Sequence, residues 1–148
     1  MQLIIDFRRA AACALVLGTA LALMPLPARA DVSLEGGAAF TGGNTSALGA
    51  VSLGLFNLPL VPLAAELTVA VPFNGGYATT LDGRFGVGGG TTLGAGAGFG
   101  TMGDTDRTDA MFDVLLAHGI APHTALEARL YFGPSRASTF FAGVRFTL

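Results

Sequence analysis

Apolar and polar residues alternate along most of the chain from residue 31 onward, which is the period of a β-strand with one apolar face. The alternation is clearest in Leu63–Phe73, where every odd-numbered residue is apolar and Glu66 and Thr68 lie between them. Segments of this kind recur, with glycine, proline and asparagine between them. The pattern predicts eight strands: Val32–Phe40, Ser46–Phe56, Leu63–Phe73, Tyr77–Val87, Thr91–Met102, Thr108–His118, Ala125–Gly133 and Ser138–Leu148.

The segments between these strands are short, such as T-G-G-N-T and N-G-G. Each is short enough for a hairpin, and none leaves room for the crossover helix that a parallel pair requires. The sequence therefore predicts an all-β fold, in which eight sequential antiparallel strands form an up-and-down barrel.

The first 30 residues have a different pattern. Arg8 and Arg9 precede an apolar run from residue 10 to 24, and Ala28-Arg29-Ala30 matches a signal-peptidase cleavage site. The run is short for a helix that crosses a membrane. We expect residues 1–30 to be a secretory signal peptide and residues 31–148 to form one domain.

The composition of residues 31–148 excludes several structural and functional classes of protein. Residues 31–148 contain five Arg, nine Asp or Glu, and no Cys, Trp or Lys, so their net charge is −4. This composition excludes a disulfide framework and a zinc–cysteine site, and it argues against nucleic-acid binding. The apolar fraction is too high for a disordered chain, and no apolar run after residue 30 is long enough for a spanning helix.

Strand length and aromatic placement predict that the apolar face points outward, toward lipid. Tilted strands of about 9–11 residues cross a bilayer, and bacterial barrels have an even number of strands. If both ends of the domain lie on the periplasmic side, most aromatic residues of the apolar face lie at the opposite, external end. This distribution is typical of an aromatic girdle at the membrane interface, here Phe40, Phe73, Tyr77, Phe99, Phe132 and Phe140.

The polar face would then fill the interior, because a barrel of eight strands is only wide enough for side chains. It carries eight charged residues: Glu35, Glu66, Asp82, Arg84, Asp113, Glu127, Arg129 and Arg145. The hairpin positions predict three cross-strand pairs, Glu66–Arg84, Asp113–Arg129 and Glu127–Arg145, and barrel closure brings Arg145 toward Glu35. We expect a closed, charged interior without a wide pore.

Two questions about this interior stay open at the sequence level. Five carboxyl groups face three arginines, so either one or two carboxyls are protonated, or a cation or water cluster shares the site. The alternating glycines 94, 96, 98 and 100 lie on the same face. They either leave space for long side chains and water or permit tight curvature.

The chain ends in G-V-R-F-T-L, where Gly143, Phe146 and Leu148 are the positions of interest. With eight alternating segments and a signal peptide, this ending resembles the small outer-membrane β-barrels typified by OmpX and the transmembrane domain of OmpA. The ending is similar to the C-terminal signal read by the barrel-assembly machinery, although family members most often end in Phe rather than Leu. The resemblance implies a bacterial outer membrane, contact with its lipid, and periplasmic chaperones and assembly machinery as transient partners. It implies no single activity.

Candidate chemistry is sparse. His118 and His123 lie near one turn and lack further metal ligands, and Asp104, Asp106 and Asp109 only loosely match a calcium loop. We interpret that acidic segment as a solvated loop; the alternative is binding of divalent cations that bridge lipopolysaccharide. Ser135, Ser138 and Asp109 lie near the external end without a histidine to activate a nucleophile. We therefore predict no catalytic, metal or cofactor site.

Two classes of function follow. The first is a non-enzymatic integral outer-membrane barrel with a structural role or an interaction role through short loops. The second is a secreted soluble β-barrel that binds a small apolar ligand, with its apolar face inward. A lipid-modifying enzyme is a weaker third class, because no histidine lies near the external end.

Overall fold

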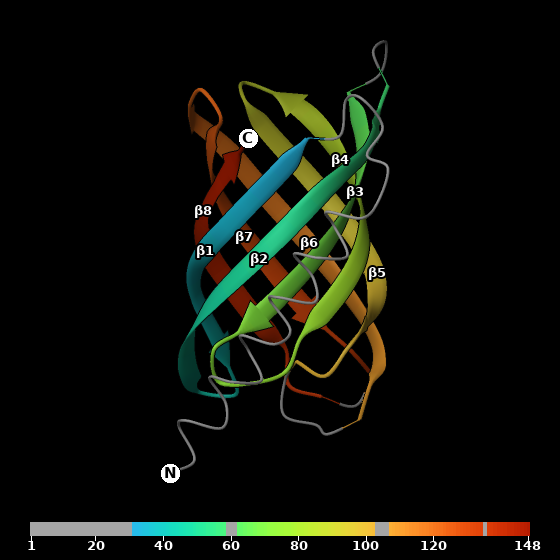
Figure 1. Cartoon of the computed structure of the whole chain (residues 1–148), viewed down its shortest axis with the longest axis vertical. Helices are drawn as coiled ribbons and strands as arrows, with labels where there is room; N and C mark the ends of the chain where they lie inside the picture. The colour runs from blue at the N-terminus through green and yellow to red at the C-terminus, as the bar shows by residue number, and fades with distance from the viewer. Residues whose placement is uncertain (1–30, 59–61, 103–106, 135) are drawn as a thin grey trace.

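Eight antiparallel strands close into a barrel in the computed structural model, which describes residues 31–58, 62–102, 107–134 and 136–148 (Figure 1). The expected signal peptide, Asp104, Asp106 and Ser135 lie outside these residues. The strands are β1 Val32–Thr41, β2 Asn44–Asn57, β3 Leu63–Pro72, β4 Ala78–Gly88, β5 Thr91–Gly100, β6 Asp109–Ala121, β7 Thr124–Phe132 and β8 Thr139–Thr147.

Each strand pairs with its neighbour in sequence, and β1 pairs with β8 from Ser33–Thr147 to Thr41–Thr139. The Leu148 N–H also donates to the carbonyl of Val32 at 2.8 Å, so pairing continues to the last residue. In Figure 1 the blue β1 lies beside the red β8. The predicted fold class, an up-and-down barrel of eight strands, is confirmed.

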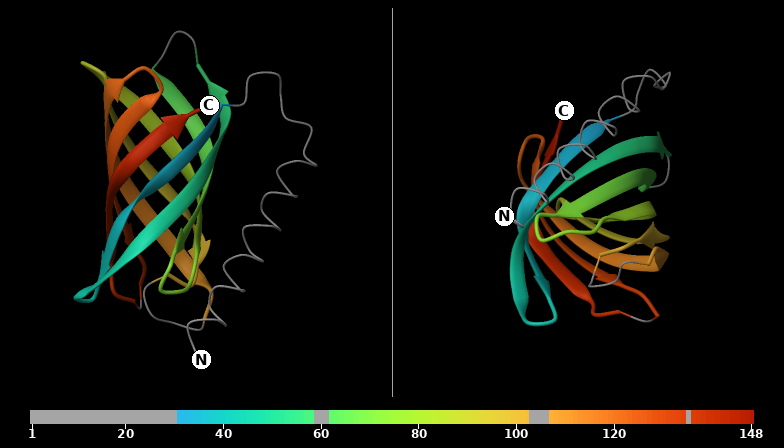
Figure 2. Two further views of the ribbon diagram at one scale, coloured as in Figure 1. Left: turned by 60° about the vertical axis from the view of Figure 1, so that its left-hand side comes forward. Right: turned by 60° about the horizontal axis from the view of Figure 1, so that its bottom comes forward.

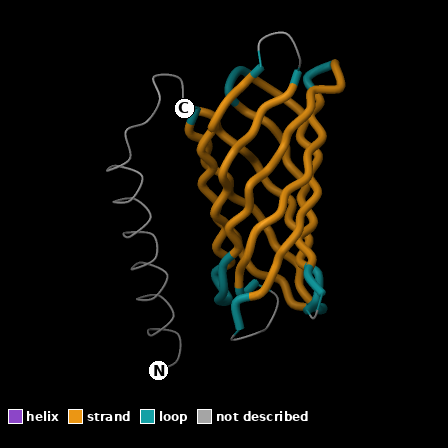
Figure 3. Tube along the Cα trace, turned by 90° about the vertical axis from the view of Figure 1, so that its right-hand side faces the viewer, coloured by secondary structure: helices purple, strands orange, loops and turns teal. Residues whose placement is uncertain are grey.

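The barrel has two distinct ends, visible in Figures 2 and 3. We call the end where β1 begins and β8 finishes the terminal end, and the opposite one the distal end. Three interruptions of the strand register lie near the terminal end, at Gly54/Phe56, Gly86/Gly88 and Gly119/Ala121. Bulges of this kind are common at barrel rims, where they increase the local twist.

Short turns join the strands. The β1–β2 hairpin turns through Gly42 and Gly43, whose φ angles are 54° and 87°. Positive φ at both central residues is the geometry that matches the twist of a two-residue hairpin, and glycine adopts it without steric cost. No helix within the described part of the chain has the length and apolar character needed to span a membrane.

The alternation separates an inner from an outer face. On β1, for example, Ser33 and Glu35 are buried in the barrel whereas Leu34 and Phe40 are exposed on its outside. Exposed large apolar residues occur on every strand except β3, whose outward apolar residues are partly exposed, and the buried charged residues lie inside. The fold is thus inverted relative to a soluble barrel, whose apolar face is inside.

Candidate functional site: the barrel interior

The interior contains a charged layer formed by the eight predicted residues. Six strands contribute to it: β1, β3, β4, β6, β7 and β8. Seven of the residues are buried, and the side chain of Arg145 is 13% exposed. Taking so many charges out of water is unfavourable unless each is paired and hydrogen-bonded, so the contacts among these residues decide whether the arrangement is stable.

Arg129 lies at the centre of the layer. Its Nη1 donates to Asp82 Oδ2 at 2.9 Å, and its Nη2 donates to Glu127 Oε1 at 2.8 Å. Nη1 also lies 3.3 Å from Asp113 Oδ2. The planar guanidinium fork suits this arrangement, because its five N–H groups serve several carboxylates at once.

Arg84 and Arg145 serve the carboxylates nearer the terminal end. Arg145 donates through both Nη atoms to Glu66, at 2.8 and 2.6 Å, and its Nη1 lies 3.3 Å from Glu35 Oε1. Arg84 donates to Glu127 Oε2 at 3.0 Å and pairs with Glu66 through Nε. Three guanidinium groups therefore hold carboxylates from five strands in one connected network.

The predicted cross-strand pairs are wrong in register. Glu66 lies directly opposite Asp82, Asp113 opposite Tyr131, and Glu127 opposite Gly143. Each register differs by two residues from the prediction, because alternation fixes which face a residue occupies but leaves shifts of two residues free. The turns absorb the difference: Val71 and Pro72 pair with β2 but not with β4.

The three predicted ion pairs nevertheless occur as diagonal contacts. Arg129 Nη1 lies 3.3 Å from Asp113 Oδ2, Arg145 Nη1 lies 3.7 Å from Glu127 Oε2, and Arg84 pairs with Glu66. An arginine side chain is long enough to reach a neighbour two positions along the next strand. Glu35 and Arg145 are directly opposite each other where β1 meets β8.

A row of hydroxyl groups supports the charged layer on β2 and β3, and sequence reasoning missed it. Ser52 donates to Glu35 Oε1 at 2.9 Å, Thr68 donates to Asp82 Oδ2 at 2.6 Å, and the two hydroxyls lie 3.0 Å apart. Both residues alternate with outward apolar residues, which was the available signal. Their hydrogen bonds add a second donor to carboxylate oxygens that Arg145 and Arg129 also contact.

The glycine row on β5 creates close approaches. A Cβ at Gly98 would overlap the backbone carbonyl of Thr79 on β4, and one at Gly100 would overlap that of Tyr77, just before β4. A Cβ at Gly96 would overlap the Asp82 and Asp113 carboxyl groups. Glycine is thus needed here both for strand proximity and for space beside charged groups. The two interpretations left open by the sequence apply at different positions of the same row.

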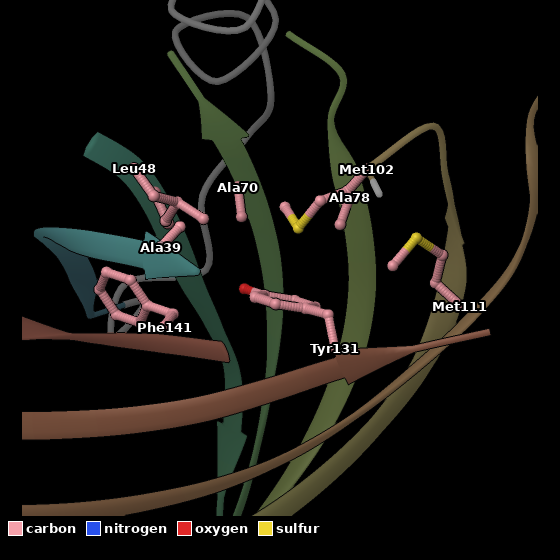
Figure 4. Packing of buried hydrophobic residues seen from close by; sticks show 9 residues of the cluster. Ala39, Leu48, Ala70, Ala78, Met102, Met111, Tyr131 and Phe141 are labelled. Atoms are coloured by element: carbon pink, nitrogen blue, oxygen red, sulfur yellow. The ribbon is translucent and has the colours of Figure 1, made fainter. Parts of the chain in front are cut away.

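Toward the distal end, the interior changes from charged to apolar. Figure 4 shows Leu48, Phe141, Met102 and Met111 directed toward the same region as the ring of Tyr131. The complete cluster is Ala39, Leu48, Ala50, Ala70, Ala78, Met102, Met111, Tyr131 and Phe141. Alternation places Met111, Tyr131 and Phe141 on the polar face of their strands, but it does not predict that they gather in an apolar cluster, which the structure shows.

A cavity of about 510 Å³ lies on the other side of the charged layer, at the terminal end. Its walls are mostly small residues, including Ala64, Gly86 and Ala117, and Glu66, Arg84 and Arg145 contribute to it from the charged layer. We call this cavity the vestibule. Along the barrel axis the interior is therefore a vestibule, a charged layer and an apolar cluster, in that order from the terminal end.

Arg136, which was not predicted as a functional residue, contacts the chain on both sides of the β5–β6 connection. Its Nη1 donates to the carbonyls of Gly100 and Met102, at 3.0 and 2.9 Å. Its Nη2 donates to the carbonyl of Arg107 at 3.0 Å and to Asp109 Oδ2 at 3.1 Å. Asp109, considered above as a candidate for external chemistry, is thus engaged by this arginine.

The six predicted girdle residues lie at the distal end. Phe40, Phe73, Phe99, Phe132 and Phe140 are exposed, and Tyr77 is partly exposed. Phe40 and Phe140 face each other across the β1–β8 pair, with ring centroids 6.2 Å apart. Phe112, which the prediction omitted, is also exposed and stacks on Phe132 at 5.9 Å.

The C-terminal residues of the predicted assembly signal occupy β8 and its end. Phe146 and Leu148 are exposed on the outer face. Gly143 instead lies on the inner face, where a Cβ would overlap the carbonyl of Gly36 and the ring of Phe141. Gly143 is therefore required for packing where the barrel closes, independently of any recognition during assembly.

The two histidines lie near the terminal end of the barrel, on β6 and in the turn that follows it. His118 Nδ1 lies 2.9 Å from the Thr91 hydroxyl, and His123 occupies the β6–β7 turn with a φ of 60°. Within the described ranges, no group of three or more His, Cys, Asp or Glu side chains is placed to bind a metal ion.

Comparison with known proteins shows the fold class. No protein-family model matches the chain, and no curated protein sequence matches it. The barrel is similar to the Yersinia pestis outer membrane protein Ail in a phospholipid bilayer nanodisc, with a TM-score of 0.57 and 12% identity over 81% of this chain and 100% of that one. It is also similar to the de novo designed barrel TMB2.3, with a TM-score of 0.60 and 14% identity over 80% of this chain and 94% of that one. The chain thus has the fold of the small eight-stranded outer-membrane barrels.

Proposed function

We propose that this chain is an integral β-barrel of a bacterial outer membrane, with a non-enzymatic, structural or loop-mediated role and an interior that is closed to solutes. The observation that carries this proposal is the inverted distribution of side chains. Phe85, Leu93, Val114 and Leu126 are among the apolar residues exposed on the outside, whereas Asp82 and Arg129 are buried inside. A continuous apolar belt of this size is stable in lipid and would cause aggregation in water.

The same distribution argues against a secreted soluble barrel that binds an apolar ligand. That alternative needs an apolar lumen along its length, but the centre of this lumen contains the charged layer. Export through a signal peptide, contact with outer-membrane lipid, and transient interaction with periplasmic chaperones and the barrel-assembly machinery belong to this proposal.

The arrangement of the interior supports the absence of a wide pore. The charged layer and the apolar cluster both fill the lumen with buried side chains, and the vestibule ends at the charged layer. An eight-stranded barrel is narrow enough for side chains to fill it.

Membrane fractionation combined with a heat-shift gel tests the location. We expect the protein to require detergent for extraction and to migrate differently before and after boiling, because a folded barrel resists detergent until it is heated. Recovery from the periplasm or medium without detergent would contradict the proposal.

Conductance across a planar bilayer tests the closed interior separately. The reconstituted protein should give no steady conductance, since ions would have to pass both the charged layer and the apolar cluster. Stable openings on the nanosiemens scale would contradict a closed lumen while leaving the membrane location intact.

A further inference from the structure

Three neighbouring strands place two carboxyl groups on either side of one glycine. Asp82 on β4 lies directly opposite Gly96 on β5, and Gly96 lies directly opposite Asp113 on β6. Both Oδ1 atoms project into the space that a Cβ at Gly96 would occupy. Glycine at this position therefore allows the two acidic groups to approach each other above the β5 backbone.

The two oxygens of each carboxyl group have different surroundings: the Oδ2 atoms lie near an arginine, and the Oδ1 atoms do not have a hydrogen-bond donor among the described residues. On the Oδ2 side, Arg129 Nη1 lies 2.9 Å from Asp82 and 3.3 Å from Asp113. On the Oδ1 side, neither oxygen has a hydrogen-bond partner among the described residues, although Asp82 is 0% and Asp113 1% exposed. One guanidinium nitrogen is thus shared by two buried carboxyl groups, whose other oxygens converge without a donor.

The charge balance of the layer leaves this pair short of positive charge. Five carboxyl groups meet three arginines. Arg84 contacts both Glu127 and Glu66. Arg145 contacts the same two glutamates. The charged groups that surround the Asp82–Asp113 pair from the packed strands are Glu35 on β1, Glu66 on β3, Arg84 on β4, Glu127 and Arg129 on β7, and Arg145 on β8.

Two neutral hydroxyls also lie near the pair. Tyr131 on β7 is directly opposite Asp113, and Thr80 precedes Asp82 by two positions on the inner face of β4. Both hydroxyls are buried without a hydrogen-bond partner among the described residues. Two adjacent buried carboxylates repel each other strongly unless a positive charge lies between them.

We propose that Asp82 and Asp113 form a buried binding site for one small monovalent cation, held between their Oδ1 atoms. The cation is either a proton, which forms an O–H···O hydrogen bond from one carboxyl to the other, or an alkali ion coordinated by both oxygens. Either one supplies a single positive charge from solvent and breaks no covalent bond. Ionisable groups inside a membrane protein commonly mark functional positions, and this site gives the barrel a sensitivity to solution conditions.

The site couples cation binding to stability. The folded barrel binds the cation, whereas the unfolded chain exposes both aspartates to water and does not hold it, so binding stabilises the folded state. For a proton, stability is greatest while the pair is protonated and falls as rising pH removes the shared proton. For an alkali ion, stability rises with the concentration of that ion.

Infrared spectroscopy of the refolded full-length mature barrel distinguishes the two cations. A shared proton should give the carbonyl stretching band of a protonated carboxyl group at neutral pH, and that band should be lost in both Asp113→Asn and Asp82→Asn. Asp31→Asn, which removes an exposed carboxylate at the mouth of the vestibule, is the matched control and should retain the band.

The alkali ion is tested on the same samples by urea titration. If it is the bound species, the wild-type barrel lacks the infrared band, and its urea midpoint rises when N-methylglucamine chloride is replaced by sodium or potassium chloride at equal ionic strength. Asp113→Asn should abolish that rise. A band that survives in both aspartate variants, or the absence of both band and ion-specific rise in the wild type, would overturn the proposal. If Asp113→Asn fails to fold, Asp82→Asn and the two wild-type measurements decide the question.

Discussion

Arg129 connects the charged layer to the apolar cluster. Its guanidinium contacts Asp82, Asp113 and Glu127, and it also lies over the ring of Tyr131 at 5.7 Å from the centroid. Tyr131 in turn belongs to the apolar cluster. One side chain thus neutralises several carboxylates and packs against the aromatic residue that begins the distal part of the interior.

Replacing Arg129 by Leu should lower the free energy of unfolding by about 3–5 kcal/mol, because it leaves several buried carboxylates without a counter-charge. Urea unfolding in detergent would measure this loss, with the folded fraction at each urea concentration read from the mobility of the unboiled protein on a gel. Arg129→Lys is the control: it keeps the charge but loses the planar fork, so its loss should be smaller. A Leu variant with the wild-type midpoint would show that the network adds nothing to stability.

At the scale of elements, the pairing of β1 with β8 closes the barrel, and glycine makes their close contact possible. Gly37 and Gly143 are directly opposite each other in this pair, on the inner face of the barrel. The ring of Phe141 lies where a Cβ at Gly143 would be. Packing inside the barrel therefore explains why residue 143 is glycine, without any role of an assembly factor.

Gly143→Ala should destabilise the purified barrel by about 1–3 kcal/mol, because the new methyl group overlaps the Gly36 carbonyl and the Phe141 ring. Gly36→Ala is a matched control from the opposite strand, since a Cβ at Gly36 has open space around it. Refolding from urea into lipid, in the absence of assembly machinery, checks this prediction. Wild-type stability of Gly143→Ala together with poor assembly in cells would instead show that Gly143 acts only as a recognition signal.

Arg136, in the β7–β8 connection, bonds Met102 after β5 and Arg107 before β6, and so it attaches this connection to both ends of the β5–β6 connection. Replacing Arg136 by Ala should make these connections more sensitive to limited proteolysis while the strands remain folded, since the hydrogen bonds to Gly100, Met102 and Arg107 are lost. Asp109→Asn removes the ion pair but leaves the three carbonyl contacts, so cleavage should increase less. Equal cleavage of the wild-type and Ala proteins would contradict this role.

At the scale of the whole molecule, the lumen differs between its two ends. Water has access to the vestibule at the terminal end, whereas the distal end is filled by the apolar cluster. The only cysteine of the chain, Cys13, precedes the barrel, so single cysteines introduced into the barrel can be probed in the mature protein without background.

A cysteine at Thr92, which lines the vestibule, should react with a water-soluble maleimide in the folded barrel, and one at Ala78, which is 1% exposed in the apolar cluster, should not. Both should react fully after unfolding, which serves as the control for labelling. Rapid reaction at residue 78 in the folded protein would show that water passes through the distal end.

The sequence predicted the strand number, the barrel and the inward position of residues such as Glu66 and Arg129, because alternation determines which face a residue occupies. It did not predict the register, since a shift of two residues leaves every side chain on the same face. It also did not predict the inward position of Phe141 as part of an apolar cluster. Alternation puts Phe141 on the face opposite to Phe140, but only the closed barrel shows that Phe141 is buried in a cluster with Leu48 and Tyr131.

The ion pairs that cross the lumen have a kinetic consequence. Arg145 on β8 joins Glu66 on β3, and Arg84 on β4 joins Glu127 on β7, so the partners belong to strands that are not adjacent in the barrel. Such contacts form only when the sheet has curled into a cylinder, and no isolated hairpin contains them. Their loss therefore accompanies opening of the whole cylinder, so unfolding should be all-or-none and slow, and the lifetime of the folded barrel should exceed that expected from its backbone pairing alone.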